Sequence, residues 1–242
     1  MERGLDCSNQ GRFPGRWLGS ASLILAPPLL LAGILLRIQF HFFFPQQLAA
    51  YHDHPRLMSA AYSSFLAGNI LLWPAVLSIG NMIGQRKPGL AAWGMSFVIF
   101  GLFARTFHAG ADYLAFQMVK IQGVENATST IGASYGAFHI VRTLNATIML
   151  GWVLLAIGAY RSETMGLLRS VALALMSALM MGVLKGSSIT SVVAAGGLCA
   201  AFVPLGFSLL RTPSLPSARN LLLGIAAGLI LVAALFYFGQ LG

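Results

Sequence analysis

Residues Trp17–Leu36 read WLGSASLILAPPLLLAGILL, an unbroken apolar run of 20 residues without a charged side chain. A helix of that length rises about 30 Å, which matches the thickness of the hydrocarbon core of a bilayer. The run continues into Arg37, Gln39 and His41 without a small-residue cleavage site. It therefore predicts a retained membrane anchor and not a cleaved signal peptide.

Further apolar runs follow, separated by short polar segments. They are Leu57–Ile83, Leu90–Val119, Ser134–Tyr160, Leu167–Leu184, Ser188–Leu210 and Leu221–Phe238. Each is long enough to cross a bilayer as a helix. The sequence predicts an all-α, polytopic membrane bundle of about seven transmembrane helices. Residues 1–16 form a polar tail that we expect to be disordered, and residues 17–242 form one transmembrane helical domain.

The composition excludes most soluble proteins. Hydrophobic residues make up 57% of the chain and charged residues 9%, and the mean hydropathy is +0.77. Soluble domains carry about 25% charged residues. The net charge of +9 comes from residues scattered between the apolar runs, with no basic cluster or stripe, so we expect the lipid bilayer and no nucleic acid as a partner.

The positions of lysine and arginine predict the orientation. A cytoplasmic N-terminus and an outer C-terminus place nine basic residues inside and four outside, which obeys the positive-inside rule. The inner ones are Arg3, Arg12, Arg16, Arg86, Lys87, Arg161, Arg169, Arg211 and Arg219; the outer ones are Arg37, Arg56, Lys120 and Lys185.

The third apolar run carries ionisable residues on one helical face. Arg105, His108 and Asp112 are spaced by three and four residues, so a helix brings them to one side. Charged groups inside a bilayer are costly unless they pair or face a wet cavity, which makes them candidates for a functional site. Asp112 is expected to pair with Arg105 or with Arg142.

The fourth run is expected to present a second polar stripe, formed by Tyr135, His139, Arg142 and Asn145. Because consecutive spans are antiparallel neighbours, the two stripes are expected to face each other. Two interpretations stay open: a functional pocket, or helices that project into the headgroup region, where charge costs little.

The second run adds Tyr62 and Asn69, which are expected either to line this pocket or to act as polar glue between helices.

The predicted topology places all five histidines on the outer side, including His41, His52 and His54 in the first outer loop. Their spacing matches no established zinc signature, so we expect no metal site. The alternative is an interfacial loop whose phenylalanines lie among the lipid headgroups. The sequence contains no phosphate-binding glycine loop and no haem attachment motif, and it identifies no cofactor.

These patterns predict an outer-facing polar pocket, between the second, third and fourth spans, that binds or acts on a lipid-soluble or amphiphilic small molecule. In an enzyme, His108 and His139 would exchange protons, Asp112 would orient a histidine, and Arg142 would hold an anionic group. The alternative is a non-catalytic transport, resistance or accessory subunit. The short loops favour a bacterial inner membrane over a eukaryotic one.

Overall fold

The computed structural model describes residues 13–137, 139–179, 182–211 and 218–239, and these residues contain helices and no strands. Among them, five helical stretches are long and apolar enough to cross a membrane. They are α1 (Gly15–Leu36), α3 (Pro55–Gly84), α4 (Pro88–Gln122), the continuous pair η2 (Ile140–Leu144) and α6 (Asn145–Arg161), and α8 (Ile189–Leu210). The described chain therefore has the composition and architecture of a helical membrane bundle.

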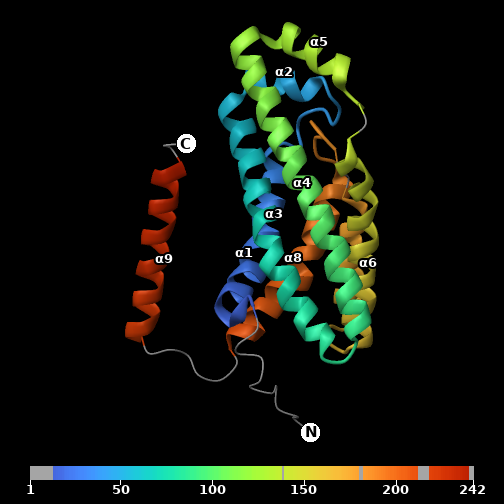
Figure 1. Ribbon diagram of the computed structural model, residues 1–242, viewed down its shortest axis with the longest axis vertical. Helices are drawn as coiled ribbons and strands as arrows, with labels where there is room; N and C mark the ends of the chain where they lie inside the picture. Colours follow the sequence, from blue (N-terminus) through green and yellow to red (C-terminus); the bar gives the residue numbers. More distant parts are fainter. Residues whose placement is uncertain (1–12, 138, 180–181, 212–217, 240–242) are drawn as a thin grey trace.

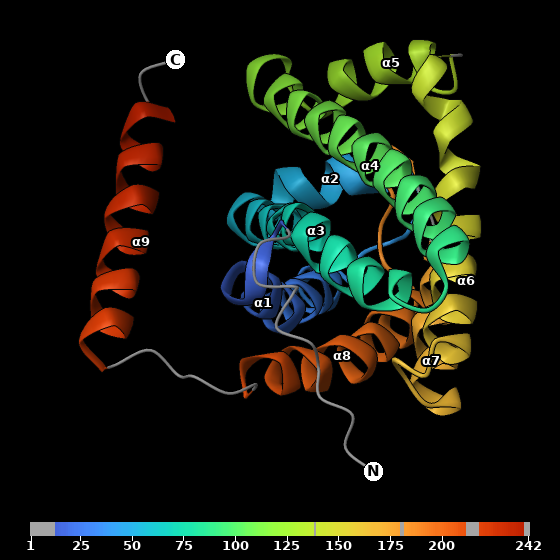
Figure 2. The same ribbon diagram turned by 60° about the horizontal axis from the view of Figure 1, so that its bottom comes forward.

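Shorter helices complete the described chain. α2 (Gln46–Asp53) and α5 (Val124–Ser134) lie across one end of the bundle, at the top of Figure 1. α7 (Leu167–Ala174) and η3 (Leu175–Ala178) pack beside α6 and α8. α9 (Ala218–Gly239) is drawn away from the other helices in Figures 1 and 2.

The main helices pack in a fixed order around the core. α1 lies between α3 and α8, and α4 lies between α3 and α6 (Figure 2). Close packing replaces the hydrophobic effect as the force between helices in lipid, so small residues occur at the contacts. A Cβ added to Gly68 of α3 would lie 2.9 Å from the carbonyl oxygen of Ala26 in α1, so only glycine permits this approach.

An apolar cluster separate from the main core fills the end of the bundle under α2 and α5. Tyr51 of α2 stacks on Phe116 of α4 with ring centroids 4.2 Å apart, and Tyr62 meets the same phenylalanine edge-on. In the loop before α2, Phe43 is exposed and Phe44 stacks on Tyr135. The two short helices thus cover the ends of α3 and α4.

The opposite end of the bundle gathers the loops that follow α3 and α6. Arg86 forms an ion pair with Glu163 and also donates a hydrogen bond to the Ser162 carbonyl oxygen, at 2.9 Å. These contacts fix the α3–α4 connection beside the α6–α7 connection.

The structure corrects two of the predicted helices. The run Leu167–Leu184 is helical only to Ala178, and residues 182–188 are not helical because Gly182 and Leu184 adopt positive φ angles of 148° and 51°. The run Ser134–Tyr160 does not start as a helix either, since Tyr135 is extended and Gly136 has a φ of 93°.

The predicted N-terminal tail falls largely outside the described residues. Residues 1–12 are not described, and α1 already includes Gly15 and Arg16.

Candidate functional site

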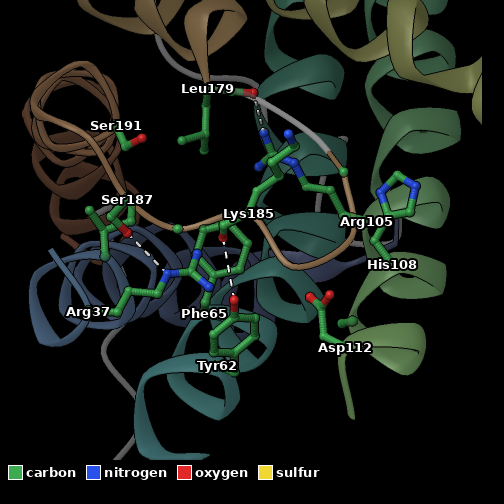
Figure 3. Close-up of a pocket in the computed structure, with 14 residues that line it drawn as sticks. Arg37, Tyr62, Phe65, Arg105, His108, Asp112, Leu179, Lys185, Ser187 and Ser191 are labelled. Carbon is green, nitrogen blue, oxygen red and sulfur yellow. Dashed lines mark hydrogen bonds between the residues drawn. The ribbon is translucent and has the colours of Figure 1, made fainter. Parts of the chain in front are cut away.

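A cavity of about 50 Å³ lies between α1, α3, α4, α8 and the non-helical residues 182–188 (Figure 3). We call residues 182–188 the strap. The cavity is lined by Ile34, Arg37, Tyr62, Phe65, Arg105, His108, Ala109, Asp112, Leu179, Gly182, Lys185, Gly186, Ser187 and Ser191.

Arg37 enters the cavity from the end of α1 and is 5% exposed. Its Nε donates a 3.0 Å hydrogen bond to Ser187 Oγ. Its guanidinium carbon lies 4.4 Å from the ring centre of Tyr62 and 4.8 Å from that of Phe65. Two aromatic faces therefore contact and stabilise the Arg37 cation.

Arg105 enters from α4 and is also 5% exposed. Its Nη2 donates to the Leu179 carbonyl oxygen at 3.2 Å, while Nε and Nη1 are buried without a hydrogen-bond partner among the described residues. Unpaired buried guanidinium donors destabilise the protein, because no hydrogen bond offsets the desolvation of the charge. A ligand that accepts hydrogen bonds would offset this desolvation cost.

Asp112 holds the strap through a hydrogen bond and forms no ion pair with any described residue. Its Oδ1 accepts a 2.6 Å hydrogen bond from the backbone N–H of Leu184, the strap residue in the left-handed conformation. Within the described part of the chain, the ion pair found is Arg86 with Glu163, so the predicted pairing of Asp112 with Arg105 or Arg142 is wrong. A backbone donor at close range has taken the place of the arginine.

Side chains and backbone groups from other elements also form hydrogen bonds with the backbone of the strap. The Tyr135 hydroxyl donates to the Val183 carbonyl oxygen at 3.1 Å. The Tyr62 hydroxyl donates to Gln47 Oε1 at 3.0 Å and lies 3.5 Å from the Lys185 carbonyl oxygen. The Gly186 N–H donates to the Phe42 carbonyl oxygen at 2.8 Å. These hydrogen bonds satisfy part of the strap's backbone inside the protein, and Gly182, Lys185, Gly186 and Ser187 of the strap line the cavity, as is typical of non-helical segments within helical membrane proteins.

Tyr135 lies outside the membrane-spanning helices, where its ionisation is informative. Burial raises the pKa of its hydroxyl, and the negative charge of Asp112 raises it further. The hydroxyl therefore stays protonated and remains a donor to the strap over an extended pH range.

The N-terminus of α8 adjoins the same cavity. Ser188 caps this 22-residue helix, and its hydroxyl accepts from the Ser191 N–H in a reciprocal capping box. Ser187 and Ser191 both line the cavity. The N-terminal end of a helix carries a partial positive charge, so it adds to the cationic character of the site.

His108 lines the cavity from α4, and His139 lies beside it with ring centroids 6.1 Å apart. The Nδ1 atoms of both rings are buried without a partner among the described residues. No group of three or more metal-ligating side chains occurs within the described ranges.

No family model, curated protein or solved structure matches the chain. Its function is therefore inferred from the site itself.

Four of the residues predicted for a site from the sequence meet in the cavity: Tyr62, Arg105, His108 and Asp112. His139 lies beside the cavity against His108, and Tyr135 contacts the strap, whereas Asn69, Arg142 and Asn145 are not part of the lining.

Asn69 connects α3 to α4, because its Nδ2 donates to the Leu102 carbonyl oxygen at 3.4 Å and to Thr106 Oγ1 at 3.2 Å. This is the polar glue that the sequence left open as an alternative.

The predicted stripe of the fourth span does not form as one helical face. Tyr135 and His139 precede the helix, Arg142 belongs to η2, and Asn145 begins α6. The exposed Arg142 guanidinium donates to the Gly136 carbonyl oxygen at 3.1 Å, and α6 contributes no residue to the cavity lining. The reason for the difference is Gly136, whose φ of 93° prevents the predicted helix from starting at Ser134.

Sequence reasoning missed Arg37, Phe65, Ser187 and Ser191 as site residues. The sequence indicated Arg37 and Lys185 only as basic residues on the outer side. One signal was present: a short apolar run interrupted by glycine is a pointer to a broken membrane helix, and broken helices often form binding sites.

Proposed function

We propose that the protein is a multi-pass membrane protein of a bacterial inner membrane, with its N-terminus in the cytoplasm. In this topology α7, η3 and the strap together make the fifth of seven crossings, and α9 makes the seventh. Support comes from the clustering of Arg86, Lys87 and Arg161 at the end of the bundle opposite α2 and α5.

The cavity, on this proposal, binds the anionic head of an amphiphilic small molecule. The observation that carries the proposal is Arg105, a buried cation with two donor nitrogens that the described residues leave unpaired. With Arg37 on the other side and the N-terminus of α8 adjacent, the site has an excess of positive charge that an anion would balance.

The position of the cavity along the helices fits an amphiphile. Arg105 lies 17 residues after Pro88, the first residue of α4, and is therefore about 26 Å along the helix axis from that end. Arg37 follows the 22 residues of α1, at about 33 Å. Since the hydrocarbon core is about 30 Å thick, both cations lie near its outer boundary, where the head of a lipid-like molecule is located.

The volume of the cavity limits what can enter. A space of about 50 Å³ holds only a few water molecules, at roughly 10 to 15 Å³ each. Sites that enclose a whole drug-sized ligand measure about 300 to 1,000 Å³. The head group alone is therefore bound, and the apolar tail lies in the bilayer.

The test is to purify the full chain in a mild detergent and identify co-purifying lipids by mass spectrometry. Wild type and Arg142→Gln are expected to carry an anionic amphiphile enriched over the bulk membrane lipids, and Arg105→Gln is expected to lose it. Arg142 is the matched control because its guanidinium is exposed and lies outside the cavity lining. The absence of enrichment in wild type, or equal enrichment in Arg105→Gln, contradicts the proposal.

A catalytic role is the second candidate, because His108 lines the cavity with an unpaired ring nitrogen and a second histidine beside it. An imidazole ring with an unpaired nitrogen can accept or donate a proton in a reaction. Catalysis predicts that His108→Ala turns a substrate-converting protein into one that still binds the amphiphile. In a non-catalytic transport or accessory subunit, the bound amphiphile is recovered chemically unchanged from both proteins.

A further inference from the structure

The two buried arginines, Arg37 and Arg105, line the same cavity. Arg105 uses one N–H on the Leu179 carbonyl oxygen, and Nε and Nη1 remain unpaired. Arg37 uses one donor on Ser187 and lies against the Tyr62 ring. Figure 3 shows the two guanidinium groups reaching into the pocket from opposite sides. A ligand must therefore accept hydrogen bonds from two directions.

Resting on the proposed function, we infer that the anionic head is a phosphate-type tetrahedral oxyanion and not a carboxylate. A carboxylate has two oxygens in one plane, which suit a single guanidinium fork. A phosphate monoester has three terminal oxygens pointing in different directions. The phosphate can therefore accept hydrogen bonds from Arg37 and Arg105 at the same time, since neither guanidinium group has to leave its side of the pocket.

The charge of the site supports the same class of ligand. The charged residues of the lining, Arg37, Arg105, Lys185 and Asp112, sum to a formal charge of +2. The N-terminus of α8 contributes roughly another half charge. A phosphate monoester carries about −1.5 to −2 at pH 7, which matches this sum better than the single charge of a carboxylate.

Lys185 adds to the positive field from the edge of the site. Its Nζ lies 5.6 Å from the ring centre of Phe42 and 5.3 Å from that of Phe43, so the ammonium group points toward the aromatic loop. It attracts a dianion without occupying the space between the arginines.

The experiment measures the thermal unfolding midpoint of the purified full-length protein in a neutral detergent. Three probes are titrated: dodecyl phosphate, dodecanoate with a tail of the same length, and inorganic phosphate. Dodecyl phosphate is expected to raise the midpoint saturably, with half-saturation at a concentration at least about tenfold lower than that of dodecanoate, because more charge-assisted hydrogen bonds are formed.

Variants separate the site from non-specific effects of a charged detergent. Arg37→Gln and Arg105→Gln are expected to raise the half-saturating concentration of dodecyl phosphate at least about tenfold, whereas Arg142→Gln leaves it unchanged. Arg105→Lys guards against misfolding of the glutamine variant. It keeps the charge, loses the planar fork, and is expected to bind with intermediate affinity.

The outcomes distinguish this inference from the proposed function. Equal stabilisation by dodecanoate and dodecyl phosphate overturns the phosphate-type head and leaves the amphiphile proposal standing. Stabilisation by inorganic phosphate at the same concentrations supports the oxyanion class and overturns the amphiphile. Equal responses in Arg105→Gln and wild type, or no response to any probe, overturn both.

Discussion

Asp112→Ala removes the group that holds the strap in its unusual conformation. The carboxylate accepts the Leu184 N–H at 2.6 Å, and both residues are buried, with Asp112 only 7% exposed. Leu184 has a φ of 51°, a conformation that costs a non-glycine residue roughly 1 to 2 kcal/mol. Without the carboxylate, this cost is compensated less, and a buried N–H loses its acceptor.

The expected loss follows from these contacts. A hydrogen bond to a charged group contributes about 1.5 to 3 kcal/mol, and an orphaned buried donor costs about 1 to 3 kcal/mol. We therefore predict that Asp112→Ala lowers the free energy of unfolding by about 2 to 3 kcal/mol. Asp112→Asn should lose about 1 kcal/mol, because its amide oxygen still accepts the N–H.

The assay combines denaturant unfolding in detergent with hydrogen exchange of peptides that cover residues 182–188. Asp112→Ala should exchange faster there than wild type, while peptides from α1 and α3 stay protected. The control is Glu125→Ala in α5, an exposed carboxylate whose loss should change stability by less than about 0.5 kcal/mol. Equally small losses in both variants, with unchanged exchange of the strap, would refute the reasoning.

Three further predictions concern packing and hydrogen bonds. Gly101→Ala should destabilise the α4–α6 contact by about 1 to 3 kcal/mol, because the added Cβ overlaps an α6 side chain, whereas Gly110→Ala has open space and should unfold like wild type. Tyr135→Phe should cost about 0.5 to 1.5 kcal/mol at neutral pH. The pKa of Tyr135 is raised in the folded protein, so wild type loses stability above about pH 10, where the tyrosine of the unfolded chain ionises. In a pH series, the phenylalanine variant should lose less stability over this range. Asn69→Ala should cost about 0.6 to 2 kcal/mol yet keep the dodecyl phosphate response in the same thermal titration, since it joins helices outside the cavity.

Most of the main helices could be predicted because their signal is local. An apolar run of about 20 residues must form a helix in lipid, where no water can satisfy its backbone. The runs that became α1, α3, α4 and α8 were therefore predicted with bounds close to those observed. The breaks at Gly136 and Gly182 were missed, since glycine is also common at close contacts within membrane helices.

The site was predictable only in part, for a related reason. Arg105, His108 and Asp112 share one face of α4, and their spacing is visible in the sequence. The hydrogen-bond partners of these side chains come from segments remote in the sequence. The sequence therefore predicted an arginine as the partner of Asp112, whereas the partner is the backbone N–H of Leu184. Charge alone suggested the pairing, and the position of the strap decided it.

The sequence by itself determined that this protein belongs in a lipid bilayer. Its apolar runs are long, and a chain with only 9% charged residues cannot form a water-soluble surface. It also determined the α4 face that carries the ionisable groups. Only the tertiary structure decided that Arg37, at the end of α1, lines the same cavity as Arg105. That juxtaposition depends on packing between helices far apart in the chain and on backbone hydrogen bonds to a non-helical segment, which no local pattern encodes.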